Sequence, residues 1–226
     1  MDHRAHKRIT KLKDSQGREI ISYIDMESLL VEHFLSIAEE PLEDKSRFIN
    51  HFTQHIPQLV TREDNHNLNR PVSEEEVSEV INEMQNGKTP GPDGFNVDFF
   101  KACWKTVKHD ILKVVEDSRR SKKVLREFNV SFIALIPKQE KAMTPDGFRP
   151  IALCNVVYKF ISKVIANRLK PLLPAHISEE QTGYVEGRHI LNNIIQAHEM
   201  VHSLKSNKQA GMIIQLDLAK AYDNLS

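Results

Sequence analysis

The sequence has few cysteines and no long hydrophobic run. Its two cysteines, Cys103 and Cys154, form no C-x-x-C pair, which fits a reduced intracellular compartment better than a disulfide framework. No apolar run approaches the roughly 18–20 residues of a membrane span, and residues 1–13 are basic without the apolar core of a secretory signal. We therefore expect a soluble protein of the nucleus and/or cytoplasm, neither secreted nor partnered with a membrane.

The chain also has no net charge, because 31 basic residues balance 31 acidic ones. The balance hides an asymmetry along the chain. Residues 14–86 hold 5 Lys+Arg against 16 Asp+Glu, a net of about −11, whereas residues 101–170 hold 16 against 6, a net of about +10. Such a basic segment suits a phosphate-binding surface. A solvated helix surface beside an acidic neighbour explains it equally well.

Hydrophobic periodicity and turn residues predict a mixed fold. Ser73 and Glu76 form a capping-box pattern that begins a helix, and Gly87 is expected to end it. The other expected elements are a hairpin around Asp14–Gly17, helices over 25–56 (broken at Pro41), 97–120, 155–169 and 188–205, a polar loop over 57–70, an irregular stretch "GKTPGPDGF" over 87–95, and strands over 129–138 and 211–218. Helices and strands do not alternate regularly, which favours the α+β class.

The stretch "HEMVH", His198 to His202, matches the H-E-x-x-H pattern of zinc hydrolases. Two histidines one turn apart on a helix can bind Zn²⁺ while Glu199 acts as a base. No H-x-x-G-x-x-H extension follows, and a five-residue pattern with two free positions arises often by chance. A zinc hydrolase is therefore kept only as a distant alternative.

Asp217 stands at the end of the last expected strand. A carboxylate there is costly unless it is paired or binds a cation, and strand-end aspartates recur in two-metal phosphoryl transfer. Hard cations need several oxygen ligands, so Asp217 alone would not hold two of them. An aspartate that caps a strand-to-helix turn is at least as common.

Lys138 and Arg149 form a second pair of candidates. Each lies where an expected strand meets a turn, and the eleven-residue gap fits a hairpin with both on one face. Two cations there could bind a triphosphate, with Arg149 able to do so bidentately. Two surface cations flanking a loop remain the alternative.

Five segments, taken together, resemble a known family. These are "GKTPGPDGF", "FIALIPK", "GFRPIALCNVVYKFISKVIANRLK", "ISEEQTGYVEGR" and "QLDLAKAYD". In this order and spacing they resemble the reverse transcriptase of LINE-type (non-LTR) retrotransposons, with plant elements nearest. The resemblance covers about residues 70–226. Residues 1–69 resemble the linker region that precedes the polymerase in that family.

The resemblance implies a right-hand polymerase fold, of which this chain would supply the fingers and the first palm strand. It implies that Asp217 is a catalytic metal ligand and that the backbone carbonyl of Leu218 helps to bind Mg²⁺ or Mn²⁺. Tyr222 would be the aromatic gate that favours dNTPs, and Lys138 and Arg149 would contact the incoming triphosphate. The turn that would bind the template comprises Pro90, Gly91, Pro92, Asp93 and Gly94. The implied partners are an RNA template, a DNA primer and dNTPs.

The sequence departs from the family pattern after Asp217, because it contains neither the Y/F-x-D-D hairpin nor the thumb. One carboxylate cannot assemble a two-metal site. We therefore expect a fold truncated before the rest of the palm and the thumb, inactive as a polymerase unless further segments complete it. The alternative is a non-catalytic remnant that binds RNA or DNA. Salt-dependent RNA binding is expected from both.

Overall fold

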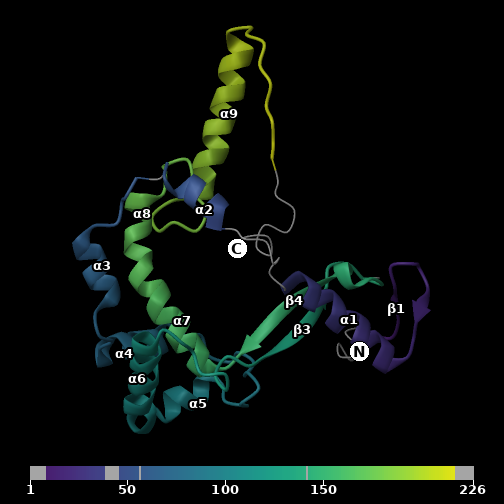
Figure 1. The fold of residues 1–226 in the computed structure, drawn as a ribbon. Helices are drawn as coiled ribbons and strands as arrows, with labels where there is room; N and C mark the ends of the chain where they lie inside the picture. Colours follow the sequence, from purple (N-terminus) through teal and green to yellow (C-terminus); the bar gives the residue numbers. More distant parts are fainter. Residues whose placement is uncertain (1–8, 39–45, 56, 141, 217–226) are drawn as a thin grey trace. The chain divides into compact units, whose positions relative to one another are not determined.

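The computed structural model describes residues 9–38, 46–55, 57–140 and 142–216. These divide into two compact units. Unit 1 comprises the described residues within 1–53 and 132–153, and unit 2 those within 54–131 and 154–216. Together they contain both helices and small sheets, so the structure is of mixed α and β type, as the sequence predicts (Figure 1). In the part of the chain that the structure describes, every helix is too short or too polar to cross a membrane.

Unit 1 is built on two small sheets. Strands β1 (Leu12–Lys13) and β2 (Glu19–Ile20) pair antiparallel, which confirms the predicted hairpin. Helices α1 (Tyr23–Ala38) and α2 (Ser46–Thr53) follow. Strands β3 (Ser131–Pro137) and β4 (Phe148–Cys154) form the second sheet, joined through the short 3₁₀ helix η2 (Pro145–Gly147). A small core of Leu12, Met26 and Phe148 holds α1 against both sheets.

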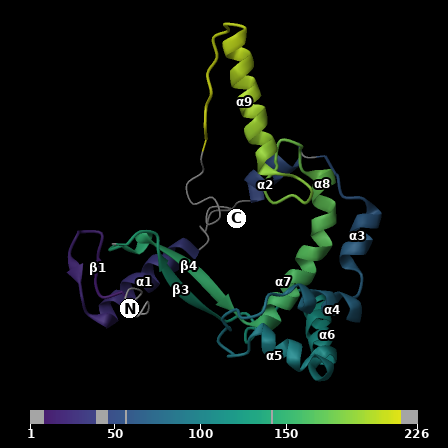
Figure 2. The ribbon, with the colours of Figure 1, turned by 180° about the vertical axis from the view of Figure 1, so that it is seen from behind.

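Unit 2 is a set of packed helices. The elements are α3 (Arg62–Asn69), α4 (Glu74–Glu83), α5 (Val97–Ala102), α6 (Trp104–Ser121), α7 (Val156–Leu169), η3 (Lys170–Leu172), α8 (Leu173–His176) and α9 (Ile190–Ser206). Helices α4, α6 and α7 pack on one another and enclose the main hydrophobic core, whose largest fully buried side chain is Phe160. Figure 2 shows these helices gathered at the base of α7.

Helix α4 begins where the capping box predicts. The Ser73 hydroxyl accepts a hydrogen bond from the Glu76 N–H, and the Glu76 carboxylate accepts one from the Ser73 N–H. Val77, Val80 and Ile81 are then buried on one face of the helix. The predicted end at Gly87 is wrong by one turn, because the helix ends at Glu83 and Gly87 lies in the loop with φ of 68°.

Three other expectations need correction. Residues 57–70 are not all loop, because Thr61 and Asp64 form a second capping box that begins α3. The single helix expected over 97–120 is two, since the chain bends at Cys103 between α5 and α6. Of the closing strand over 211–218, the described residues 211–216 have no assigned strand partner and are exposed.

Candidate nucleic-acid interface

The turn Pro90–Gly94 rests on the beginning of α7. A Cβ on Gly91 would lie 2.4 Å from the Asn155 Oδ1, 2.5 Å from the Asn155 N and 2.6 Å from the Cys154 carbonyl carbon. Only glycine allows two backbone segments to approach this closely. The Asp93 N–H also donates to the Asn155 Oδ1 (3.2 Å). The turn is therefore held to α7 by a close contact and a hydrogen bond.

Asn155 connects this turn to a third segment. Its side chain is buried, with 3% exposed, and its Nδ2 donates to the Glu127 carbonyl in the loop after α6 (3.1 Å). One amide thus satisfies a donor on the turn and an acceptor on the loop, which a buried amide requires. The sequence analysis missed Asn155. The only local signal was its position before the first residue of a helix, where Asn is favoured.

The rest of the turn is shaped by local hydrogen bonds. Gly94 adopts φ of 79°, where glycine is favoured, and the Asp93 carboxylate accepts from the Phe95 N–H (3.0 Å). The preceding loop is held to α5, where Asp98 accepts from the Gly87 N–H (2.9 Å) and Lys101 donates to the Met84 carbonyl (2.7 Å). The Asp93 and Gly94 side of the turn is exposed to solvent, whereas Gly91 is buried.

The loop on the other side of Asn155 carries exposed positive charge. Helix α6 ends at Ser121 and is followed by the cap residue Lys122, which has φ of 55°. Lys122, Lys123 and Arg126 are exposed and form no ion pair within the described residues. Other cations of the basic segment are occupied inside the fold: Lys108 pairs with Glu74, and Arg119 pairs bidentately with Glu116. The fold thus leaves a cationic loop, residues 122–126, beside the turn Pro90–Gly94.

Arg168 on α7 was also missed by the sequence analysis. Its side chain is 8% exposed and binds Glu76 bidentately, at 2.9 and 2.8 Å. It also donates to the carbonyls of Leu68, Arg70 and Pro71. Burial alone would raise the pKa of Glu76, but the hydrogen bonds and charge of Arg168 outweigh burial and lower it. Arg168 therefore fastens the start of α4 to α7.

A cavity of about 430 Å³ lies beside Arg168, lined by residues of α3, α4 and α7. Both of its cations are already paired with a carboxylate. Arg70 and Arg168 both pair with Glu76, and Asp64 belongs to the α3 capping box. The cavity therefore offers little unpaired charge to a triphosphate, and its polar groups serve the packing of the helices.

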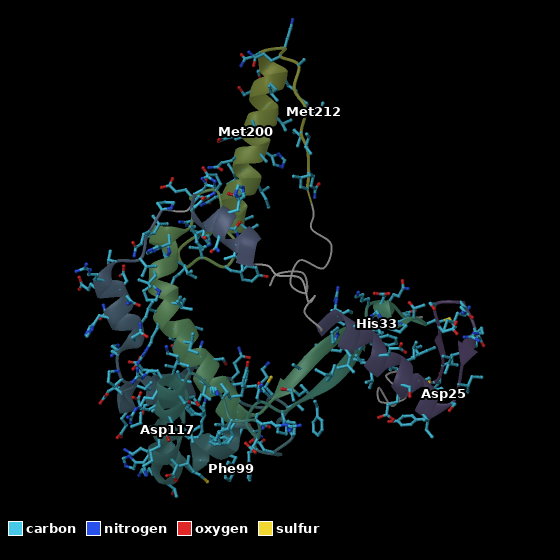
Figure 3. All side chains as sticks on the ribbon, viewed as in Figure 1. Asp25, His33, Phe99, Asp117, Met200 and Met212 are labelled. Atoms are coloured by element: carbon cyan, nitrogen blue, oxygen red, sulfur yellow. The ribbon has the colours of Figure 1, made fainter. Side chains whose placement is uncertain are left out.

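Lys138 and Arg149 lie in the β3–β4 hairpin of unit 1. Lys138 follows the last residue of β3, and its N–H donates to the Gly147 carbonyl (2.8 Å), two residues before Arg149. The two backbones therefore meet at the turn, as the sequence predicts, and both side chains are exposed. The Lys138 ammonium donates to the Asp146 carbonyl (2.7 Å), and Asp146 pairs with His33 of α1, labelled in Figure 3 (3.7 Å).

The candidate metal ligands Asp217 and Leu218 and the candidate gate Tyr222 lie outside the described residues. Within those that are described, no group of three His, Cys, Asp or Glu side chains is placed to hold a metal ion. His198, Glu199 and His202 lie on α9 and are exposed, and the His202 ring contacts Ser206 at 3.3 Å. The zinc-hydrolase alternative therefore has no support.

Comparison with known proteins supports one family. Residues 136–226 match the family described as reverse transcriptase (RNA-dependent DNA polymerase). The chain is similar to an uncharacterized 149 kDa protein of transposon TX1 from Xenopus laevis, 27% identical over 158 residues, which are 70% of this chain and 12% of that protein.

Two further relatives agree. A Pol polyprotein of the type-1 retrotransposable element R2 from Nasonia vitripennis is 24% identical over 70% of this chain and 15% of its own length. A probable RNA-directed DNA polymerase from transposon BS of Drosophila melanogaster is 21% identical over 69% of this chain and 18% of its own length. The chain thus spans less than a fifth of each of these three relatives.

None of them is from a plant, so the likeness to plant elements stays a prediction. Residues 136–226 thus match a reverse transcriptase domain, and the similarity to these transposon and retrotransposable-element proteins supports a LINE-type (non-LTR) reverse transcriptase.

Proposed function

We propose that this chain supplies the fingers and the first palm strand of an RNA-directed DNA polymerase, and that the turn Pro90–Gly94 and the cationic loop 122–126 bind its RNA template. The observation that carries the proposal is the Asn155 link, which joins the turn to the loop. Single-stranded nucleic acid is bound by positively charged surfaces that follow the phosphate backbone. The proposed domain division, a linker over 1–69 and polymerase over 70–226, belongs to the same hypothesis.

The proposed nucleotide site combines residues from the beginning and the end of the segment 136–226, which matches the reverse transcriptase family. Lys138 and Arg149 would contact the triphosphate of a dNTP, and Tyr222 would exclude a ribose 2′-hydroxyl. To bind the triphosphate, the Lys138 ammonium would leave the Asp146 carbonyl. Asp217 and the Leu218 carbonyl offer oxygen ligands, which Mg²⁺ and Mn²⁺ prefer. When bound, the metal ions would stabilise the attacking and leaving oxygens of nucleotidyl transfer.

Template binding is tested by fluorescence anisotropy with a labelled single-stranded RNA at several salt concentrations. For single strands, each neutralised phosphate makes the slope of log K against log salt more negative by about 0.7. Replacing Lys122, Lys123 and Arg126 with glutamine should therefore make this slope less negative by up to about 2. Lys113→Gln is the matched control, since Lys113 is exposed on α6 but pairs with Asp110 (3.8 Å). Absence of RNA binding at low salt, or an unchanged slope in the triple variant, would contradict the proposal.

A second measurement separates polymerase from binding remnant. Primer extension on an RNA template, abolished by Asp217→Asn, would support catalysis by this chain. RNA binding without extension would support the alternative, a protein that binds RNA or DNA without polymerising.

A further inference from the structure

Five aromatic side chains form a continuous column from the core of unit 2 to its surface. Each ring contacts the next with a centroid separation typical of aromatic pairs. In order, the pairs are Trp104–Phe160 (5.8 Å), Phe160–Phe100 (6.1 Å), Phe100–Phe99 (5.5 Å) and Phe99–Phe95 (4.5 Å). The column begins at Trp104, which is partly buried against the core, passes through the buried Phe160 and ends at Phe95, the residue that follows the turn Pro90–Gly94.

From Phe160 outward, exposure rises along the column. Phe160 is fully buried and Phe100 is 6% exposed, whereas Phe99 is 39% and Phe95 46% exposed. Figure 3 labels Phe99 on α5. The two outer rings could be no more than a hydrophobic pair at the edge of the core, and exposed apolar side chains are common on protein surfaces. Two further observations distinguish this pair from such a surface contact.

First, the outer rings are fixed in place. The Phe95 N–H donates to the Asp93 carboxylate (3.0 Å), and the Phe99 N–H donates to the Asn96 side chain at the start of α5 (2.9 Å). Phe99 also contacts Phe100 edge to face, with an interplanar angle of 88°. Because both backbones are held and the rings support each other, binding a planar ligand would order few groups that are not ordered already.

Second, the outer end of the column lies among cationic segments. Asn155 hydrogen bonds to Asp93, two residues from Phe95, and to Glu127, which follows Arg126. Lys88 is exposed on the loop that enters the same turn. A fixed aromatic ring beside flexible cations is the arrangement with which proteins stack a base and bind its phosphates.

We propose that Phe95 is a base-stacking residue that binds one unpaired base of single-stranded RNA, with Phe99 supporting its ring. This inference rests on the proposed template binding and adds a specific contact to it. Tyr184 offers a contrast. It is fully exposed in unit 2, but its loop carries Glu179, Glu180 and Glu186, so we expect no comparable contact there.

The test measures the affinity of Phe95→Ala for two labelled RNAs of the same length, one unmodified and one abasic throughout. We expect Phe95→Ala to weaken binding of the unmodified RNA about fivefold to tenfold and to leave abasic binding nearly unchanged. Phe95→Trp should keep the affinity, and its added indole fluorescence should be quenched by the unmodified RNA alone. Tyr184→Ala, the removal of an exposed aromatic elsewhere in unit 2, should bind both RNAs like the wild type.

The possible results distinguish failure of the proposed template binding from failure of the stacking role of Phe95. If the wild type binds neither RNA, the proposed template binding is wrong and the stacking contact falls with it. If the wild type binds RNA but Phe95→Ala binds equally well, or loses the same factor for both RNAs, template binding stands and the stacking role is refuted. Emission of Trp104, the chain's single tryptophan, shows whether the core of the alanine variants is intact, because its ring stacks on Phe160.

Discussion

Replacing Gly91 with alanine should destabilise unit 2 and detach the turn Pro90–Gly94. The new Cβ would lie within 2.4–2.6 Å of three atoms, and two of these, the Asn155 N and the Cys154 carbonyl carbon, belong to the backbone where β4 leads into α7. A flexible side chain could rotate away from such a clash. A backbone fixed by the first turn of a helix cannot, so either the turn or α7 must move.

The structure allows an estimate of the cost. Relieving an overpacked contact by small shifts costs typically about 1–3 kcal/mol. If the turn lifts away instead, the Asp93–Asn155 hydrogen bond is lost and the buried Asn155 Oδ1 loses its only partner within the described residues, which costs about 1–3 kcal/mol. Either route gives a loss of about 2 kcal/mol in the free energy of unfolding. A shift of the turn would also displace Phe95.

The assay is urea unfolding followed by Trp104 fluorescence. Gly94→Asn is the matched control, because Gly94 has open space around its Cα and a φ of 79°, a conformation that asparagine tolerates better than most residues. We expect that variant to lose less than about 1 kcal/mol. An unchanged unfolding midpoint in Gly91→Ala would refute the reasoning, since it would mean that the contact with α7 does not hold the turn.

Two further predictions concern buried and partly buried charges. Arg168→Met should cost about 3 kcal/mol in unfolding free energy, because it leaves the Glu76 carboxylate without its bidentate partner. Arg70→Met removes a more exposed partner of the same carboxylate. This second variant should cost less than about 1 kcal/mol in unfolding free energy. Equal losses in the two variants would contradict this. The hydrogen bonds from Arg119 lower the pKa of Glu116 to about 2. A carboxylate whose pKa is depressed in the folded state stabilises it above its unfolded pKa of about 4.5. This contribution is lost as the pH falls from there toward 2, so stability in Glu116→Gln should fall less steeply over that range than in the wild type.

Local sequence rules predicted the elements that are marked by a few neighbouring residues. The Ser73–Glu76 box predicted the start of α4, and the residues around Asp14–Gly17 predicted the β1–β2 hairpin. The same rule could have found α3, because Thr61 and Asp64 stand at capping-box spacing, but the polar composition of 57–70 was interpreted as loop. The break at Cys103 left no such signal, since the apolar pattern continues through it.

The amino-acid sequence by itself predicted the α+β class, the positions of most elements and the resemblance to reverse transcriptases, because each of these depends on residues that are neighbours along the chain or on motifs in a fixed order. Only the tertiary structure decided which cations are paired and which are exposed, and which residues hold the turn Pro90–Gly94. The contact of Asn155 with Asp93 spans 62 positions, and those of Arg168 with Glu76 span 92. Pairings at such separations depend on how the helices pack, which no local pattern specifies. For this reason Asn155 and the exposed end of the aromatic column emerged from the fold.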